Sequence, residues 1–334
     1  MASFFFRGKR VLVAGGSGLI GRQLVGLLNE RGARVRVVSL DDDRLAPPEC
    51  QFLKLDLTEK ANCLAACKDI EVVFNLLCAK GSPQMSKMQP ASFFVPIIQL
   101  SINLMEAARI CGVERYLFAS SLAVYPPAEI FYEDDVWLGD PSPNDRFAGW
   151  AKRMGELQAE AYAIEYDWRG VSIVRPANTY GPHDDFGKQT AMVVPSLIRR
   201  ALSGENPLTV WGNGSAVRDF IHARDVARGM MMVVKKGITQ PMNLGSGSGV
   251  SIRELVDAII KHLPKTPEVI WDATKPGGDP CRVLDTARAR SFGIKPTISL
   301  VPGIAETMDW YQAHANASDL RYNVFSDGDE SPAG

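Results

Sequence analysis

The sequence predicts an α/β fold in which a doubly wound parallel sheet is joined to a smaller C-terminal lobe. Between about residues 10 and 125, short β-branched runs alternate with longer segments of helical spacing. This rhythm is typical of a parallel sheet covered by helices on both faces. A glycine-rich turn follows the first run, and from about residue 177 the chain changes to loops rich in glycine, proline and asparagine. We therefore expect two structural units.

The composition excludes several classes of protein. The chain has 334 residues, 46% hydrophobic content, 22% charged residues and a net charge of -1, which favours a soluble globular protein over a nucleic-acid-binding, disordered or membrane-spanning one. The opening MASFFFRGKR has too few apolar residues for a signal peptide, so we expect a cytoplasmic protein. The six cysteines have neither CxxC nor Cys/His ligand spacing, which predicts free thiols and no metal site.

The elements of the sheet can be placed in order along the chain. The predicted strands are RVLVAG, VRVVSL, FLKLDL, EVVFNLL, RYLFASS and, at 171–176, VSIVRP. The first domain is then 1–176, to which a segment at about 223–245, with a helix at about 223–235, returns. The second lobe is mainly 177–316 and includes VVPSLIRRAL and SIRELVDAIIKHL as helices. Residues 317–334 form an acidic tail.

Three glycines follow the first strand with the spacing GxxGxxG, in VLVAGGSGLIGRQLVGLL. Glycine is needed at such a turn because the backbone approaches a pyrophosphate and the helix lies close to the strand. The helix N-terminus then stabilises the negative charge. With the strand before it and the helix after it, this turn predicts a Rossmann-type NAD(P)-binding domain. We expect Gly15, Gly18, Leu19 and Ile20 to contact the cofactor.

The end of the second strand leaves the choice between NAD and NADP open. Ser39 stands where an acidic residue usually receives the adenosine ribose hydroxyls of NAD. Serine removes the charge that repels a 2′-phosphate, and Arg22 favours such a phosphate. Asp41 and Asp42, however, are close enough in sequence to accept the ribose hydroxyls instead.

Two residues after the third strand are candidates for the adenine contact. Asp56 suits the edge of the adenine ring, and Leu57 suits the pocket around it. The alternative for Asp56 is a structural cap, because aspartate is common where a helix begins.

Several blocks of the sequence occur together and in a fixed order: AGGSGLIG, NLMEAARICGVERYLFASSLAVY, RPANTYGP, VWGNGSAVRDFIHARDVARG, NLGSGSGVSIREL and GDPCRVLDTARARSFGIKPTISLVPGIAETMDWY. In these blocks the chain resembles the extended short-chain dehydrogenases/reductases of the NAD-dependent epimerase/dehydratase family, over about residues 9–312. YGPHDDF and the GDP-x-R-x-LDT block are most similar to the GDP-L-fucose synthase branch. The resemblance implies hydride transfer between a nicotinamide and a carbon of a nucleoside-diphosphate sugar.

The resemblance also assigns the catalytic positions. Ser121 matches the hydroxyl that hydrogen-bonds the reacting oxygen, and Ser120 is structural. Lys152 matches the lysine that holds the nicotinamide ribose and lowers the pKa of a catalytic tyrosine. That tyrosine stands one helical turn before the lysine in the family, and this chain has Ala148 there, in FAGWAKRMGE. The alternative for Lys152 is an ordinary solvated helix lysine.

The helical phase around Lys152 supports this assignment. Residues 148 and 152 share one face, one turn apart. A different face carries an apolar stripe that we expect to pack: Trp150, Met154, Leu157, Ala161 and Ile164. Family members often dimerise through this helix and the helix before SSLAVY, so we expect a homodimer.

Alanine cannot transfer a proton, which leaves three explanations of Ala148 open. The substitution was introduced to trap a bound complex, or another group does the work in a natural enzyme, or the protein binds NAD(P) and a sugar nucleotide without turnover. The intact remainder of the motifs favours the first two. Tyr125 is a possible replacement acid, although a packing role is more usual at a strand end.

Two further absences narrow the chemistry that the resemblance allows. Sugar-nucleotide 4,6-dehydratases carry an Asp-Glu pair directly after the catalytic hydroxyl, where this chain has Leu122 and Ala123. GDP-L-fucose synthases use a cysteine and a histidine at positions matching Ala123 and Met192. The remaining possibility is hydride transfer at the sugar C4 carbon, carried out by an epimerase or, alternatively, by a 4-ketoreductase.

Residues of the second lobe are candidates for binding the sugar nucleotide. Arg218 in RDFIH and Arg282 in CRVLD resemble the diphosphate clamp, because guanidinium groups suit paired phosphate oxygens. Asn178 in RPANTYGP matches an asparagine that contacts the diphosphate or the sugar, and Trp211 is a candidate for the nucleobase pocket or for the core. His183 is expected to be a loop residue rather than a catalyst. The nucleobase and the sugar stay undefined.

Overall fold

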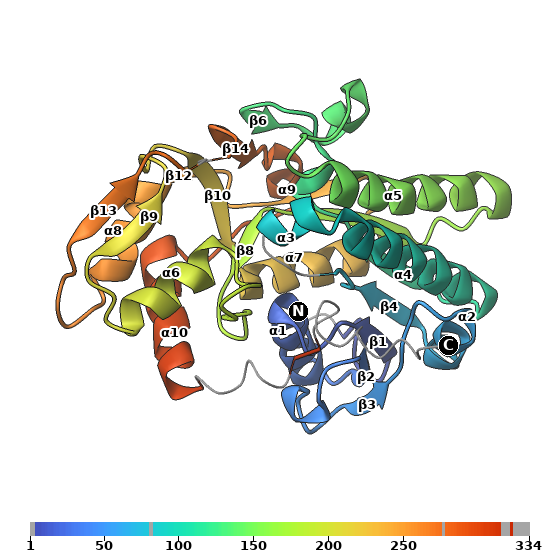
Figure 1. Ribbon diagram of the computed structural model, residues 1–334. Helices are drawn as coiled ribbons and strands as arrows, with labels where there is room; N and C mark the ends of the chain where they lie inside the picture. Colours follow the sequence, from blue (N-terminus) through green and yellow to red (C-terminus); the bar gives the residue numbers. More distant parts are fainter. Residues whose placement is uncertain (1–3, 80–82, 276–277, 315–320, 323–334) are drawn as a thin grey trace, which may run out of the picture.

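The computed structural model of the chain describes residues 4–79, 83–275, 278–314 and 321–322. A parallel sheet flanked by helices forms the larger part, and a smaller lobe stands beside it (Figure 1). The predicted α/β class with a Rossmann-type sheet is confirmed. The predicted tail at 317–334 lies outside the described residues except for Arg321 and Tyr322.

The large sheet has seven strands in the order β11-β7-β5-β4-β1-β2-β3, and all neighbouring pairs are parallel. Its strands are β1 (Arg10–Ala14), β2 (Arg34–Ser39), β3 (Gln51–Lys54), β4 (Val72–Asn75), β5 (Arg115–Ala119), β7 (Val171–Pro176) and β11 (Met242–Leu244). The strand order reverses between β1 and β4. Ligands of such sheets bind beyond the carboxyl ends of the strands at this reversal.

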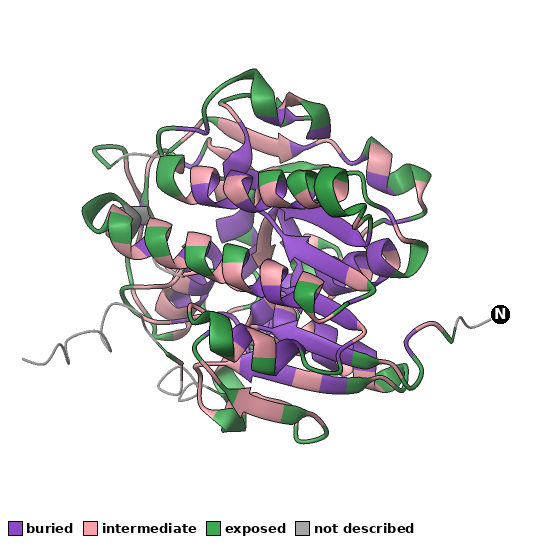
Figure 2. Ribbon diagram, turned by 90° about the vertical axis from the view of Figure 1, so that its right-hand side faces the viewer, coloured by how far each residue is buried: buried purple, intermediate pink, exposed green. Residues whose placement is uncertain are grey.

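Helices cover both faces of this sheet, as Figure 2 shows by the buried strands lying between helical layers. On one face lie α1 (Leu19–Glu30) and α7 (Ala223–Lys236), and on the other lie α2 (Lys60–Cys67), α4 (Pro90–Ile110) and α5 (Arg146–Tyr166). The strands serve two cores because successive side chains point to opposite faces: Val11 and Val13 join the first core, and Leu12 and Ala14 the second. Shorter helical pieces complete this part: α3 (Pro83–Met88), α9 (Ala287–Ser291), η1 (Asp43–Leu45), η2 (Leu122–Val124) and η3 (Glu133–Leu138).

The smaller lobe has its own core. A mixed sheet runs in the order β12-β10-β14-β6, with β8 also paired to β10, and a separate pair joins β9 to β13. These strands are β6 (Ile130–Phe131), β8 (Asn178–Tyr180), β9 (Leu208–Trp211), β10 (Val217–His222), β12 (Gly249–Ser251), β13 (Val269–Asp272) and β14 (Cys281–Leu284). Its helices are α6 (Val193–Leu202), α8 (Ile252–Ile260) and α10 (Leu300–Ala313). Because β10 leads directly into α7, this lobe is tied to the large sheet.

One helix in the described part of the chain, α4, is long and apolar enough to cross a membrane, with a mean hydropathy of 1.4 over its most apolar window. It packs against α2 and α5, and its residues Phe93, Ile97 and Leu104 are buried in the domain. The same length and composition are found in core helices of soluble domains. Its contacts are therefore those of a helix that covers the sheet.

The predicted packing stripe of α5 is wrong. Leu157 is 39% exposed and Ile164 is 79% exposed, so the stripe points away from the molecule. The buried face instead carries small residues and charged residues that find partners inside: Gly149, Ala151, Lys152, Arg153, Gly155, Glu156 and Ala159. Small residues let the helix lie close to its neighbours, and paired charges are tolerated there because they are hydrogen-bonded.

Candidate active site

The glycine turn between β1 and α1 lies at the carboxyl edge of the large sheet. A Cβ atom on Gly21 would lie 2.1 Å from the Gly15 carbonyl oxygen, so only glycine allows the helix to come this close to the turn. Gly18 is the N-cap of α1 and offers no side-chain cap. Among the described residues, no acceptor bonds the N–H groups of Leu19 and Ile20. The uncapped start of the helix is therefore suited to a pyrophosphate.

The predicted ribose-binding residues meet at the end of β2. The Ser17 hydroxyl donates to Asp41 Oδ2 at 2.6 Å and lies 2.8 Å from Ser39 Oγ, and the Asp41 N–H donates to Ser39 Oγ at 3.2 Å. Asp42 turns away and binds the Arg44 guanidinium. Of the two aspartates left open by the sequence, Asp41 is thus the one beside Ser39.

Asp56 and Leu57, adjacent in the sequence, have different environments in the structure. Leu57 is buried, with 2% exposure, in the core between the sheet and α2. Asp56 is exposed, and its Oδ1 accepts from the Thr58 N–H and hydroxyl, both at 2.8 Å. Asp56 therefore caps its own turn, which is the alternative that the sequence left open, while its second carboxylate oxygen stays available.

Lys152 is buried at the carboxyl ends of β4 and β5. Its Nζ donates to the Ala119 carbonyl oxygen at 2.8 Å and to the Leu77 carbonyl oxygen at 3.0 Å, and the residue is only 3% exposed. Burial lowers its pKa, and the neighbouring Cys78 and Glu156 oppose that shift. This lysine is not a solvated helix residue. Two of its three N–H donors are fixed by the sheet.

Ala148 lies one turn before Lys152 and is half-buried, packed against the apolar cluster of Phe93 and Ile97 in α4 and Ala151 in α5. Ser121 is the N-cap of η2, and its Oγ accepts from the Ala123 N–H at 3.1 Å. A Cβ atom on Gly149 would lie 2.4 Å from the Ala123 carbonyl oxygen. Glycine at 149 therefore lets α5 pack directly on the turn that holds Ser121.

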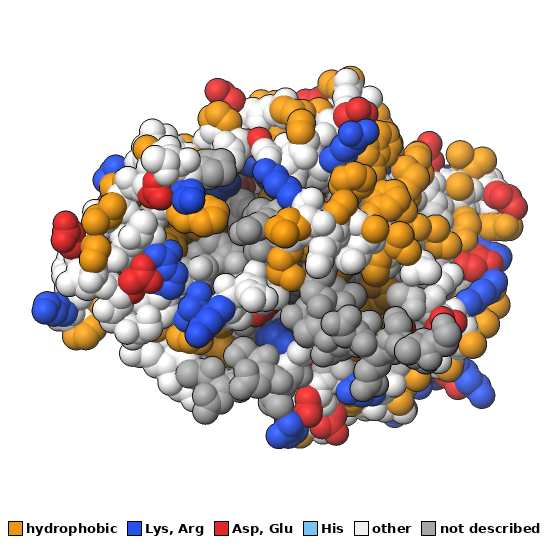
Figure 3. All heavy atoms as spheres, viewed as in Figure 1, with side chains coloured by type: hydrophobic (Ala, Val, Ile, Leu, Met, Phe, Trp, Pro, Cys, Tyr) orange, Lys and Arg blue, Asp and Glu red, His pale blue; other side chains and the backbone are white. Residues whose placement is uncertain are grey.

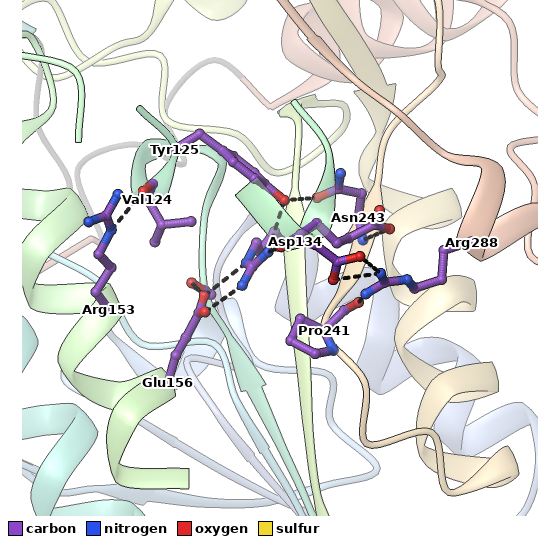
Figure 4. Close-up of polar contacts among 11 residues, drawn as sticks. Val124, Tyr125, Asp134, Arg153, Glu156, Pro241, Asn243 and Arg288 are labelled. Atoms are coloured by element: carbon purple, nitrogen blue, oxygen red, sulfur yellow. Dashed lines mark hydrogen bonds and ion pairs between the residues drawn. The ribbon is translucent and has the colours of Figure 1, made fainter. Parts of the chain in front are cut away.

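A buried polar network, shown in Figure 4, connects the helix that carries Lys152 to the sheet. The Arg175 guanidinium binds Glu156 through Nη2 at 2.6 Å and Nε at 3.0 Å, with both side chains under 5% exposed. Ser120 donates its hydroxyl to the same carboxylate. Since Glu156 lies one turn after Lys152, the network joins the lysine helix to β7 and to the strand end before Ser121. Ser120 is thus structural, as expected.

The sequence contains a signal for this network, although it was not among the predicted features. Arg175 is a charged residue within an otherwise apolar strand, and Glu156 shares the face of α5 that carries Lys152. Charged residues at positions predicted to be buried are paired almost without exception. The pairing itself spans two separate elements and could not be read from spacing.

Tyr125 belongs to the same network. It is 1% exposed and stacked on Phe131, with ring centroids 4.9 Å apart. Its hydroxyl donates to Asn243 Oδ1 at 2.6 Å and accepts from Arg175 Nη1 at 3.0 Å, while burial raises its pKa. A hydroxyl so engaged is poorly placed to exchange protons with a ligand. Tyr125 therefore acts as a buried packing residue.

The two candidate clamp arginines stand side by side in the small lobe. Arg218 in β10 is in register with Arg282 in β14. Arg282 Nη2 reaches across to Asp145 Oδ2 at 2.6 Å, and Asp145 immediately precedes α5. Burial lowers the pKa of Arg218, and repulsion from Arg282 adds to this shift. The structure thus brings both arginines to the N-terminal end of the helix that carries Ala148 and Lys152.

The remaining predicted residues are spread over the second lobe. Asn178 Nδ2 donates to the Asp219 carbonyl oxygen at 3.0 Å, so this bond between β8 and β10 already engages one donor of the side-chain amide. Trp211 is 56% exposed at the end of β9 and is therefore no core residue, and Met192 is 50% exposed before α6. His183 packs on the Trp310 ring, and burial, followed by nearby cations, lowers its pKa to about 3. A neutral imidazole at physiological pH suits a loop residue.

Taken together, the geometry offers an uncapped helix start for a phosphate, a pair of guanidinium groups, and a buried ammonium group bonded to the carbonyl two residues before Ser121, with a third donor that has no partner among the described residues. In the described residues, no group of three or more histidine, cysteine, aspartate or glutamate side chains is arranged to hold a metal ion.

Comparison with known proteins identifies the family to which the chain belongs. The model of the NAD dependent epimerase/dehydratase family matches residues 11–245. GDP-L-fucose synthase 1 of Arabidopsis thaliana is 30% identical over 321 residues, which cover 93% of this chain and 95% of that protein.

Two solved structures extend the comparison to three dimensions. The UDP-glucose 4-epimerase of Thermotoga maritima, determined with UDP-glucose, has a TM-score of 0.80 and 27% identity, covering 92% of this chain and 99% of that one. The UDP-glucose 4-epimerase of Thermus thermophilus, in complex with NAD, has a TM-score of 0.80 and 28% identity, covering 91% and 99%.

Proposed function

Because this chain belongs to the NAD-dependent epimerase/dehydratase family, we propose that it is an NAD(P)-dependent nucleotide-sugar epimerase that acts by hydride transfer at the sugar C4 carbon. The observation that carries the proposal is the burial of Lys152 between two strand-end carbonyls, at the same sheet edge as the glycine turn; one of these carbonyls belongs to Ala119, two residues before Ser121. A lysine with no role beyond solvation or packing is rarely buried in this way.

In the proposed site, the cofactor is held along the carboxyl edge of the sheet. Gly15, Gly18, Leu19 and Ile20 receive the pyrophosphate, and the free N–H of Lys152 binds the nicotinamide ribose. A bound nicotinamide supplies a hydride acceptor and donor. Fixed donors of this kind need no reorganisation when the ligand arrives.

The chain's own residues then handle the reacting oxygen. Ser121 hydrogen-bonds the oxygen on C4 and orients it, while the Lys152 cation favours loss of a proton from that oxygen. Position 148 carries only a methyl group, so no side chain accepts the proton there and it has to pass to water. We expect turnover to be reduced by roughly 10²–10⁴-fold relative to a tyrosine at this position.

The sugar nucleotide enters from the small lobe. Arg218 and Arg282 clamp the diphosphate, Asn178 contacts the diphosphate or the sugar, and Trp211 stacks on the nucleobase. Arg282 exchanges Asp145 for the incoming phosphate oxygens. Leu122 and Ala123 are apolar and buried, so no carboxylate follows Ser121 to expel a hydroxyl group by the 4,6-dehydratase route.

A 4-ketoreductase is the second candidate, and the similarity to GDP-L-fucose synthase supports it. A non-catalytic protein that binds NAD(P) and a sugar nucleotide is the third, and Ala148 supports it. An epimerase keeps its cofactor through the cycle, whereas a reductase must exchange it. Mass spectrometry of ligands carried through purification therefore separates the first two: retained nicotinamide cofactor supports the epimerase.

We also propose that the protein is a cytoplasmic homodimer. The outward stripe of α5 adjoins exposed Val95, Ile102 and Ile110 of α4. Figure 3 shows hydrophobic side chains gathered over this part of the surface. Contiguous exposed apolar area of this kind marks an interaction surface. Analytical ultracentrifugation tests the assembly, and a monomer at all micromolar concentrations would contradict it.

The activity is tested with Ala148→Tyr. The variant restores a phenol one turn before Lys152, and we expect turnover of one of the UDP-, GDP-, CDP- or dTDP-sugars to rise by roughly 10²–10⁴-fold. Phe147→Tyr is the matched control, because it adds a phenol at an exposed neighbouring position, 44% exposed, without facing Lys152. Absence of hydride transfer in Ala148→Tyr with every sugar of the panel would favour the non-catalytic protein.

A further inference from the structure

The last described residues of the chain contact the sheet domain rather than the lobe that precedes them. Helix α10 ends at Ala313 in the small lobe, yet the Tyr322 N–H donates to Asp41 Oδ1 at 2.8 Å, beside the end of β2. Figure 1 shows this segment next to α1, away from the end of α10. Arg321 Nη2 donates to the His183 carbonyl oxygen at 2.5 Å. These contacts join three segments at the proposed adenosine end of the cofactor site.

The contacts engage the carboxylate that the sequence offers to an NAD ribose. Asp41 Oδ2 accepts from the Ser17 hydroxyl at 2.6 Å, and Asp41 Oδ1 accepts from Tyr322. Both oxygens therefore already have a donor from the protein. A ribose 2′-hydroxyl has to compete with these donors, and this weakens the usual preference of such an aspartate for NAD.

Two guanidinium groups converge at the same place. Arg22 donates to the Leu45 carbonyl oxygen, and Arg321 lies close enough for its cation to depress the pKa of Arg22, after the larger effect of burial. Within the described ranges neither arginine forms an ion pair with a carboxylate. Each guanidinium has five donors and spends one on a carbonyl oxygen. Two neighbouring cations with free donors are stabilised by a bound dianion.

We propose that Arg321 is a cofactor-specificity residue, which together with Arg22 binds the 2′-phosphate of NADP while the Tyr322 N–H occupies Asp41. Ser39 fits this role, because its hydroxyl at the strand end carries no charge to repel the phosphate. The proposal rests on the proposed NAD(P)-dependent function and deepens it by naming the cofactor. It also gives the C-terminal segment a place in the cofactor site.

The test compares the binding of NADPH and NADH to the full chain by fluorescence titration. We expect the unmodified chain to bind NADPH more tightly than NADH, and Arg321→Gln to weaken NADPH about tenfold with less than about a twofold change for NADH. Arg290→Gln is the matched control, since Arg290 is an exposed arginine on α9, which packs on β11 at the opposite edge of the sheet. Equal changes for both cofactors, or no change, would overturn the proposal.

Two substitutions of Tyr322 test its backbone hydrogen bond to Asp41. Tyr322→Pro removes the N–H donor to Asp41, whereas Tyr322→Ala keeps it. We expect Tyr322→Pro alone to raise NADH affinity relative to NADPH by about threefold, because Asp41 is released for the ribose. A chain ending at residue 320 should lose NADPH preference as Arg321→Gln does. Tighter binding of both cofactors to that shorter chain would instead mean that the C-terminal residues compete with the cofactor, and the proposal would fail.

Failure of this inference is distinct from failure of the proposed function. If neither nicotinamide cofactor binds to the chain, the proposed function itself is wrong. If both bind with the same affinity and neither responds to Arg321→Gln, the cofactor-dependent function stands and only the role of Arg321 is lost.

Discussion

Lys152 and Arg282 stand at the two ends of the candidate site and are held by different kinds of partner. Lys152 is bound by two backbone carbonyl oxygens and is 3% exposed. Arg282 is bound by the Asp145 carboxylate, and its side chain is 13% exposed. Strand-end carbonyls cannot leave without disturbing the sheet, whereas a carboxylate can be replaced by another anion. The cofactor end is therefore preformed, and the sugar end is exchangeable.

The largest effect on the difference between the two ends is expected from replacing Arg175, which belongs to the buried network that connects the Lys152 helix to the sheet. Arg175→Met leaves the Glu156 carboxylate buried without its partner, so we expect the free energy of unfolding to fall by about 3–5 kcal/mol. Urea denaturation measures the change. Arg282→Met is the matched variant at the sugar end, where the loss should stay within about 1 kcal/mol because the pair is partly solvated. Equal losses in the two variants would remove the distinction between the ends.

The next test addresses ligand binding at the sugar end. Arg282→Met should weaken the binding of UDP or GDP, used as diphosphate probes, by about 10–100-fold, since a charge-assisted bidentate contact is lost. Isothermal titration calorimetry measures the affinities. Arg290→Met serves as the control, being an exposed arginine outside the proposed site. Unchanged binding of both diphosphates by Arg282→Met would place the clamp elsewhere.

The parts of the site that the sequence predicted are those with local chemistry. The glycine turn is encoded by neighbouring residues, whereas Lys152 and Ala148 were implied by the family resemblance and supported by the helical period. The inward face of α5 was not predicted, because the apolar stripe is outside and the buried face carries Arg153 and Glu156. Periodicity reports that a helix has two faces, and only the tertiary partners decide which one is buried.

Long-range partners explain what else was missed. Tyr125 receives its role from Asn243, which is 118 residues away, and Asp41 receives a donor from Tyr322, which is 281 residues away. Each partner is a common polar residue with several possible roles. No spacing rule connects them, so only the folded structure could bring them together.

A third prediction concerns His183, in the loop that follows β8. Its pKa is lowered to about 3, so the unfolded chain takes up a proton as the pH falls below about 6.5 while the folded chain does not. Stability is therefore lost on acidification below pH ~6.5. His183→Gln should reduce the loss between pH 7 and pH 5 by about 1–2 kcal/mol in urea denaturation, after allowance for partial solvation. The exposed His262→Gln is the control and should keep the full loss. An acid response of His183→Gln equal to that of the unmodified chain would mean that His183 is solvated.

The smallest expected effect isolates the exchange at the sugar end. Asp145→Asn removes the nearer competing charge while keeping a side chain that suits the start of α5, so the Arg282 guanidinium keeps only the longer contact with Asp279, at 3.7 Å, and is more available to the ligand. We expect UDP or GDP to bind about threefold more tightly, since one partly solvated ion pair is worth less than about 1 kcal/mol. Asp140→Asn, an exposed carboxylate in the same loop, controls for the change in net charge. Titration at two salt concentrations separates the local effect from general attraction, because screening weakens only the latter strongly. Weaker binding by Asp145→Asn would show that the carboxylate positions Arg282 instead of competing for it, and both ends of the site would then be preformed.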